Sequence, residues 1–225
     1  NNKPKLFRAI IYSSEGMGKS SFAALAPKPI VQPLDDSMGR IVVDKMEVPA
    51  SFDELMDNFE SVLREEHDYK TFVIDAMNWA WPLVADHVIK HHEKANDLSA
   101  KNIEDYGYMK GYMLAMQYWG ELIAKLDEIH RLRQMNILVT MHEKMAKREL
   151  PTGEQYQIID LGLPTVKNGD AAALWRQWAD VIGHIRAAES IADLRTDKHG
   201  NVTKPGRKVT IGSGERRIQF AANDL

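Results

Sequence analysis

The sequence predicts an α/β fold in which a mostly parallel central sheet is flanked by helices. Three observations lead to this prediction. An apolar segment at 6–12 runs directly into a glycine-containing loop and a helical segment. A continuous apolar run at 71–75 ends in a carboxylate, which suits a strand buried on both faces of a parallel sheet. Extended and helical segments alternate along most of the chain, which is the order found in layered α/β domains.

The individual elements follow from periodicity and from the residues that begin and end helices. The helix after the glycine loop is stopped by Pro27 and Pro29. The helix at 51–66 begins at Ser51, with Glu54 completing a capping box. We expect strands at 6–12, 30–34, 71–75, 136–141 and 180–185, and helices at 20–25, 51–66, 80–94 and 103–135.

The C-terminal region differs in character from the rest of the chain. Residues 197–201 have turn chemistry, and 208–211 and 216–220 are expected to be hairpin strands. We therefore expect residues 1–190 to form the core and residues 191–225 to form a β-hairpin extension of the same domain.

Composition limits the classes of function. The chain has 225 residues, of which 44% are hydrophobic and 27% charged, as in soluble globular domains. The absence of cysteine excludes disulfides, thiolate zinc sites and cysteine nucleophiles. A formal net charge of −3 means that any DNA contact must come from a local basic patch. No apolar run approaches the roughly 18 residues of a membrane span, and the N-terminus has no signal-peptide pattern. A cytoplasmic protein without membrane contact is expected.

The loop after the first strand has the spacing of a phosphate-binding P-loop, except that Ser13 replaces its first glycine. Glycines let successive backbone N–H groups point at phosphate oxygens, and the following helix N-terminus adds partial positive charge. We expect Lys19 to reach the β- and γ-phosphates of ATP. The alternative is a glycine turn that happens to precede a helix. The predicted nucleotide-binding residues are Ser13, Ser14, Glu15, Gly16, Met17, Gly18, Lys19, Ser20 and Ser21.

A magnesium site is predicted from two oxygen ligands. The Ser20 hydroxyl would bind the ion directly, and Asp75, at the end of a buried strand, would hold it through its water shell. The alternative for Asp75 is an N-cap residue that starts the next helix.

With these segments placed, the order of landmarks resembles bacteriophage-encoded RecA-like P-loop ATPases, which include Sak-type single-strand annealing recombinases. The resemblance extends from about Leu6 to about Ile218. The landmarks are the loop 16–20, the strand and acid at 30–36 with 40–41 after it, the segments 67–75 and 106–108, the strand ending at 140–142, the segment 178–180 and the arginine-rich C-terminal strand.

This resemblance implies a RecA-like fold, DNA recombination or annealing activity, and assembly into a homo-oligomeric ring or filament. It implies that Asp35, with Asp36 as neighbour, orients the attacking water, although aspartate is one methylene shorter than the family's glutamate. A solvated turn acid is the alternative. It implies that His142 senses the γ-phosphate, and that Arg216 or Arg217 contributes a cation to a neighbouring subunit's site. A solvated edge charge is the alternative for the arginines. The other histidines show no metal-ligand spacing and are expected at the surface.

The segment 143–153 lies where RecA-like proteins place a DNA-binding loop. Its cations Lys144, Lys147 and Arg148 are predicted to bind single-stranded DNA, coupled to the nucleotide state through His142. Two other functions remain open: a small-molecule or nucleotide kinase, and an interaction protein whose ATP site is a switch with little turnover. The kinase hypothesis is the less supported of the two, because nucleotide kinases usually carry an arginine-rich lid and no such cluster occurs between Lys90 and Met135.

Overall fold

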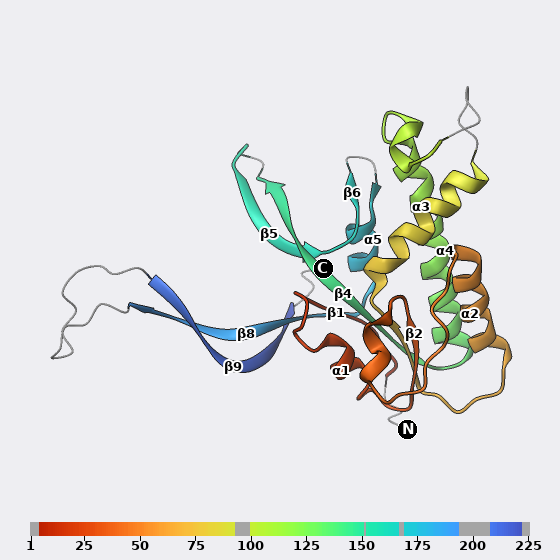
Figure 1. Ribbon diagram of the computed structural model, residues 1–225, viewed down its shortest axis with the longest axis horizontal. Helices are drawn as coiled ribbons and strands as arrows, with labels where there is room; N and C mark the ends of the chain where they lie inside the picture. Colours follow the sequence, from red (N-terminus) through yellow and green to blue (C-terminus); the bar gives the residue numbers. More distant parts are fainter. Residues whose placement is uncertain (1–4, 93–99, 151, 167–168, 194–207, 222–225) are drawn as a thin grey trace.

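The computed structural model describes residues 5–92, 100–150, 152–166, 169–193 and 208–221, and it confirms a mixed α/β architecture with a mostly parallel, curled sheet (Figure 1). The described sheet has the strand order β2-β3-β4-β1-β8-β9, and β5 pairs with β4 outside this path. Neighbours from β2 to β8 are parallel, whereas β9 is antiparallel to β8. The strands are β1 Arg8–Ser13, β2 Pro29–Pro33, β3 Thr71–Asp75, β4 Asn136–Glu149, β5 Gln155–Leu161, β8 Val181–Asp193 and β9 Lys208–Ala221.

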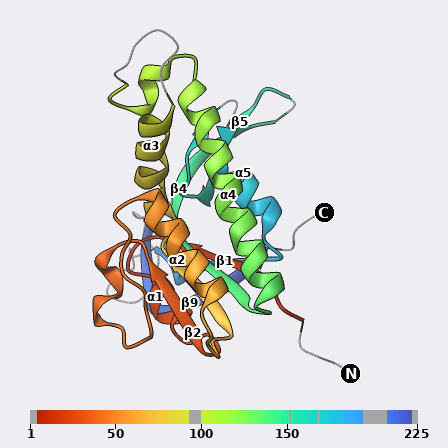
Figure 2. The ribbon, with the colours of Figure 1, turned by 90° about the vertical axis from the view of Figure 1, so that its right-hand side faces the viewer.

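Helices cover the two faces of this sheet unequally (Figures 1 and 2). The larger core packs α2, α3, α4 and α5 against alternate residues of the strands, such as Ile10 and Phe72. The smaller core, on the other face, joins Ile11 and Val73 to α1 and the 3-10 turn η1. The helices are α1 Lys19–Ala23, α2 Phe52–Arg64, α3 Ala80–His91, α4 Lys110–Leu132 and α5 Ala171–Trp178, with 3-10 turns η1 Asp36–Arg40, η2 Met77–Trp79 and η3 Ile103–Tyr106. A two-stranded pair, β6 Thr165–Val166 and β7 Gly169–Asp170, precedes α5.

Three expectations about the elements are wrong. The helix expected at 103–135 is broken, because Gly107, Tyr108 and Met109 have left-handed φ angles of 63°, 46° and 60° between η3 and α4. The expected loop after 142 is a β-hairpin, since β4 continues to Glu149 and pairs with β5. The strands expected at 208–211 and 216–220 are one strand, β9, which pairs along β8. The turn expected at 197–201 lies outside the described residues.

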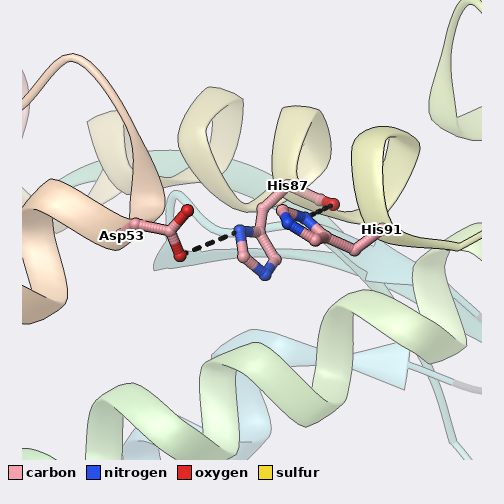
Figure 3. A group of neighbouring side chains, drawn as sticks. All are labelled: Asp53, His87 and His91. Carbon is pink, nitrogen blue, oxygen red and sulfur yellow. Dashed lines mark hydrogen bonds and ion pairs between the residues drawn. The ribbon is translucent and has the colours of Figure 1, made fainter.

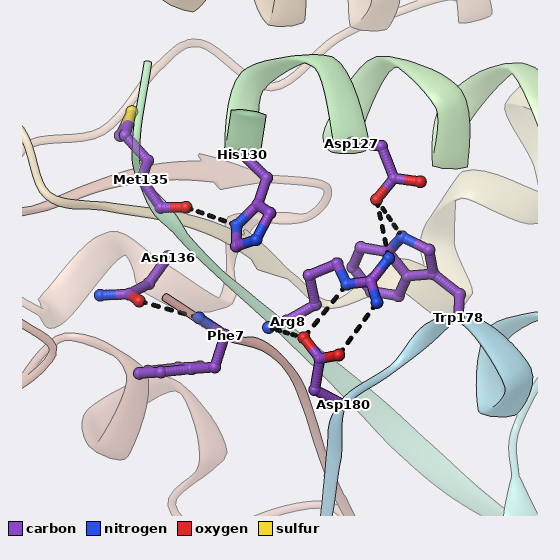
Figure 4. Close-up of polar contacts among 8 residues, drawn as sticks. All are labelled: Phe7, Arg8, Asp127, His130, Met135, Asn136, Trp178 and Asp180. Carbon is purple, nitrogen blue, oxygen red and sulfur yellow. Dashed lines mark hydrogen bonds and ion pairs between the residues drawn. The ribbon is translucent and has the colours of Figure 1, made fainter. Parts of the chain in front are cut away.

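A polar network fixes the amino end of β1 (Figure 4). The Arg8 guanidinium donates to Asp180 at 2.9 and 3.1 Å and to Asp127 of α4 at 3.1 Å. Trp178 of α5 donates its indole N–H to the same Asp127 oxygen at 2.8 Å. Hydrogen bonding to Arg8 holds the pKa of Asp180 below its usual range. Strand β1 is therefore tied to α4 and to the junction between α5 and β8. Among the described helices, none combines the length and apolarity that crossing a membrane requires.

Candidate functional site

The glycine loop joins β1 to α1 and encloses a buried cation. Gly16 and Gly18 have φ angles of 73° and 88°, a region that residues with a side chain rarely adopt. Lys19 begins α1 and is only 6% exposed. Its ammonium donates to the backbone oxygens of Ser14 at 2.9 Å and Ser13 at 3.2 Å, and burial lowers the pKa of Lys19. The loop therefore holds its lysine against its own carbonyl oxygens, a contact that an anion would replace.

Asp75, at the end of β3, carries a polar atom without a protein partner. The side chain is 1% exposed, and its Oδ1 accepts a hydrogen bond from Thr140 of β4. Its Oδ2 is buried and has no hydrogen-bond partner within the described part of the chain. A buried carboxylate oxygen in this position requires a cation or a water molecule. Together with the half-buried Ser20 hydroxyl in the same pocket, Asp75 supplies the oxygen ligands that suit Mg²⁺.

A pocket of about 610 Å³ opens at the carboxyl ends of β1, β3 and β4. Ligands bind at this edge in open α/β sheets. Of the residues predicted from the sequence, the pocket brings together Glu15, Gly16, Gly18, Lys19, Ser20, Ser21, Asp35, Asp75, His142 and Arg216. Ser13, Ser14 and Met17 do not line it. It also includes four residues that sequence reasoning missed: Ser37, Ile41, Ala76 and Trp79.

Asp35 caps a turn and also lines the pocket. Its carboxylate accepts a hydrogen bond from the Ser37 backbone N–H at 3.0 Å, so it caps the turn η1. It is half-buried and lines the pocket, whereas Asp36 is exposed and does not. The carboxylate is therefore in place to face a ligand, with part of its hydrogen-bonding capacity used by the cap.

His142 lies in β4, the strand next to β3, but it does not end that strand as expected, because β4 continues to Glu149. Its backbone N–H donates to Asn78 Oδ1 at 2.6 Å, and the Asn78 amide donates to the Gly162 carbonyl at 2.9 Å. Burial, and then the charge of Lys19, lower the pKa of the His142 ring. The ring is therefore neutral at pH 7, with one N–H to donate. Asn78, three residues beyond Asp75, gave no sequence signal for this positioning role.

Arg216 of β9 reaches the glycine loop of its own chain. A Cβ atom added to Gly18 would lie 2.8 Å from Arg216 Nη1. The family resemblance placed such an arginine in a neighbouring subunit's site, whereas here it lines the pocket that its own Lys19 occupies. Arg217 is engaged elsewhere, because its guanidinium donates to Glu215 at 3.0 and 3.1 Å.

Behind the pocket, a second histidine links β1, β4 and β8. His184 is 6% exposed, stacks on Tyr12 at 4.4 Å and lies 2.6 Å from Glu143, the residue after His142. Arg186 donates to His184 Nδ1 at 3.1 Å, so Nε2 carries the proton and donates to Glu143. The expectation that the other histidines lie at the surface is wrong for His184. The expectation that they show no metal-ligand spacing is wrong for His87 and His91, whose ligand atoms lie within 4.8 Å of each other.

The three cations proposed for DNA do not form one patch. Lys144 is half-buried and donates to the Leu163 carbonyl and, at 2.6 Å, to Thr165 Oγ1. Burial lowers the pKa of Lys144. Lys147 and Arg148 are exposed but are consecutive in β4, so their side chains point to opposite faces of the hairpin. The prediction of a joint basic loop is therefore wrong in its geometry.

Comparison with known proteins agrees with the pocket. A family model described as an AAA domain matches residues 5–221, nearly the whole chain. No curated protein matches the sequence significantly.

Proposed function

The chain belongs to the AAA-domain family, and on that premise we propose that its pocket binds ATP with Mg²⁺ and hydrolyses the nucleotide. One observation carries the proposal: a buried lysine and a buried carboxylate with an unpaired oxygen lie in one pocket beside a glycine loop. Burying charges of both signs in one pocket is costly, and a ligand that carries both signs, such as a magnesium–phosphate complex, would satisfy the unpaired Asp75 oxygen and take over the lysine from the loop carbonyls.

Each side chain has a role that its position supports. Lys19 would exchange the carbonyl oxygens of Ser13 and Ser14 for phosphate oxygens. Ser20 and Asp75 would hold Mg²⁺, which when bound would neutralise charge on the phosphates. Trp79, 47% exposed at the pocket edge, offers a ring face on which the base can stack.

Hydrolysis needs a water oxygen to attack the γ-phosphorus as the bond to the bridging oxygen breaks. Asp35 would accept a hydrogen bond from that water, and Arg216 would stabilise charge on the phosphoryl oxygens. His142, as a neutral donor, would contact the γ-phosphate.

The decisive experiment measures ATP binding and phosphate release in Lys19→Ala. Both should be lost while the circular dichroism spectrum is retained, because Lys19 is the one lysine among the described residues that line the pocket. Lys70→Ala removes an exposed lysine at the amino edge of β3 and is the matched control. Unchanged phosphate release in Lys19→Ala would refute the ATPase proposal.

A more specific role rests on the RecA-like resemblance: DNA recombination or single-strand annealing by a ring or filament of subunits, with DNA binding coupled to ATP. What supports it is that β4 carries His142 in the pocket and Lys147 and Arg148 in the projecting hairpin. A typical coupling free energy of about 1–3 kcal/mol means that ATP changes DNA affinity roughly 5- to 150-fold, and that DNA changes ATP affinity by the same factor.

Fluorescence anisotropy of a labelled oligonucleotide tests this role with and without a non-hydrolysable ATP analogue. His142→Ala should abolish the nucleotide dependence, and the double variant Lys147→Ala, Arg148→Ala should weaken binding in both states and reduce its salt dependence. The control double variant, Lys5→Ala with Lys70→Ala, removes equal charge elsewhere. Absence of DNA binding in the wild type would eliminate this role.

A nucleotide-dependent switch with little turnover is the second candidate. It is favoured by Asp35, whose shorter carboxylate is already engaged with Ser37. Tight ATP binding with negligible phosphate release, with or without DNA, would identify it.

A further inference from the structure

A second cluster of ligand-type side chains lies between α2 and α3, outside the nucleotide pocket (Figure 3). Asp53 is in the first turn of α2, and His87 and His91 are one turn apart near the end of α3. One ligand atom of each lies within 4.8 Å of those of the other two. We propose that Asp53, His87 and His91 bind a divalent transition-metal ion of the zinc type.

The orientation of His87 is fixed by packing. Its ring lies 4.8 Å from Phe52 and 4.5 Å from Tyr118, and its side chain is 13% exposed. Its Nδ1 lies 3.5 Å from Asp53 Oδ1. This separation is long for a hydrogen bond. It matches the spacing of about 3.3 Å between two ligands of a tetrahedral ion bound at about 2.0–2.1 Å.

The tautomer of His91 is set by its own helix. His91 Nδ1 lies 3.0 Å from the His87 carbonyl oxygen. A carbonyl can only accept, so Nδ1 carries the proton and Nε2 keeps a free lone pair. Metal-binding histidines characteristically donate their second N–H to such a carbonyl or to a carboxylate. The two rings stack at 4.0 Å, so the free nitrogen is held beside His87.

The surroundings suit a cation. The site lies at the C-terminal end of α3, where the helix dipole is negative, and the positive N-terminal end of α2 opposes it and is offset by the Asp53 carboxylate. Asp86 lines the same small hollow and adds a second carboxylate, while Lys90 opposes it. Asp53 and His91 are exposed, and the ligand atoms need to approach one another by at most about 1.5 Å to reach tetrahedral spacing, which leaves a fourth position for water. The site is separate from the nucleotide pocket, since His87 is eight residues, about 12 Å along a helix, beyond Trp79.

Imidazole ligands distinguish this ion from the magnesium of the nucleotide pocket. Zn²⁺, Co²⁺ and Ni²⁺ bind imidazole well, whereas Mg²⁺ prefers oxygen ligands and releases water reluctantly. Bound zinc would join the first turn of α2 to the last turn of α3 and stabilise both. At a free zinc concentration one hundred times its Kd, the Tm should rise by about 5–10 °C.

The test is zinc titration of the full chain without a histidine tag, in excess Mg²⁺, followed by calorimetry and thermal unfolding. One zinc ion per chain should bind. Asp53→Asn or His91→Gln should weaken zinc binding by more than about tenfold, because replacing even a residue that only hydrogen-bonds to a metal ligand lowers metal affinity by about that factor. Asp57→Asn, one turn along α2, removes the same charge at an exposed position and should leave binding unchanged. Without zinc, His91→Gln should unfold near the wild-type temperature because His91 is exposed, and Asp53→Asn about 1–4 °C lower because it loses a first-turn carboxylate that interacts favourably with the helix dipole. Equal zinc affinity in wild type, Asp53→Asn and His91→Gln would overturn the proposal, as would no binding to wild type.

Discussion

Replacing each loop glycine by alanine separates backbone strain from contact with Arg216. Gly16 and Gly18 both have left-handed φ angles, so alanine should cost a similar amount at either position, about 1–2 kcal/mol. For a chain of this size, that corresponds to a Tm lower by about 2–8 °C. The two sites differ in their neighbours, since a Cβ at Gly16 meets nothing within 4 Å, whereas at Gly18 it meets Arg216 Nη1 at 2.8 Å.

The contact at Gly18 is with the end of a flexible side chain, so the guanidinium should move away while the backbone stays. Gly18→Ala should therefore lose about the same stability as Gly16→Ala but also displace Arg216 from the pocket. An arginine that stabilises a transferring phosphoryl group contributes about 10³-fold or more to turnover. The assay is single-turnover ATP hydrolysis combined with thermal unfolding, in a double-mutant cycle with Arg216→Ala.

In this cycle, Gly18→Ala should reduce turnover at least tenfold more in the wild-type background than in Arg216→Ala, a coupling of about 1.4 kcal/mol. Gly16→Ala should reduce turnover equally in both backgrounds. An equal loss from Gly18→Ala in both backgrounds would show that Arg216 does not act on its own chain's pocket.

Three further predictions use stability as the readout. Asp75→Asn removes a buried charge with an unpaired oxygen, so the nucleotide-free protein should gain at least about 2 °C in Tm while Mg²⁺-dependent hydrolysis is lost; a lower Tm would contradict this. Because Arg8 lowers the pKa of Asp180, their interaction stabilises the fold above the unfolded pKa of about 3.9 and is lost as pH falls through the lower folded value. Asp180→Asn should thus cost about 0.2–1 kcal/mol at pH 7, reduced by solvent screening, and nothing near pH 2 in thermal melts; a constant difference would exclude the ion pair as its cause. Gly162→Ala should destabilise the fold by about 1–3 kcal/mol, because its Cβ would lie 2.7 Å from a backbone oxygen of β4. Gly120→Ala, with open space around it, should not destabilise the fold. Equal Tm values for the two variants would show that the backbone adjusts at Gly162.

The parts of the fold that could be predicted are those with local signals. The glycine loop follows β1 because the apolar strand and the glycines are contiguous. The predicted N-cap at Ser51 is confirmed, since its Oγ accepts from the Glu54 N–H at 3.1 Å. The reciprocal half of the capping box is not formed, because the Glu54 carboxylate accepts instead from the N–H of Ala50, one residue before the cap, at 2.7 Å. Asp75 ends a strand buried along its whole length, as its apolar run indicated.

The parts that could not be predicted depend on distant partners. Beyond His142, β4 is polar on both faces, so its extended form comes from pairing with β5 and has no periodic signature. The contact between Glu143 and His184 joins residues 41 positions apart. Arg216 enters the pocket only because β9 pairs along β8 and brings it back to the loop.

Strand β4 is continuous from the sheet through the pocket into the projecting hairpin, so a rotation of the strand near His142 would be carried to the hairpin tip. Its first half lies between β1 and β3, whereas from Glu143 onward its backbone pairs, among the described strands, with β5 alone (Figure 1). Glu149 is seven residues past His142, about 23 Å along an extended strand. A rotation of about 5° near His142 would therefore swing the hairpin tip by about 2 Å. A change of sub-ångström size in the strand at the pocket would thus become a displacement large enough to make or break a contact at the far end of the hairpin.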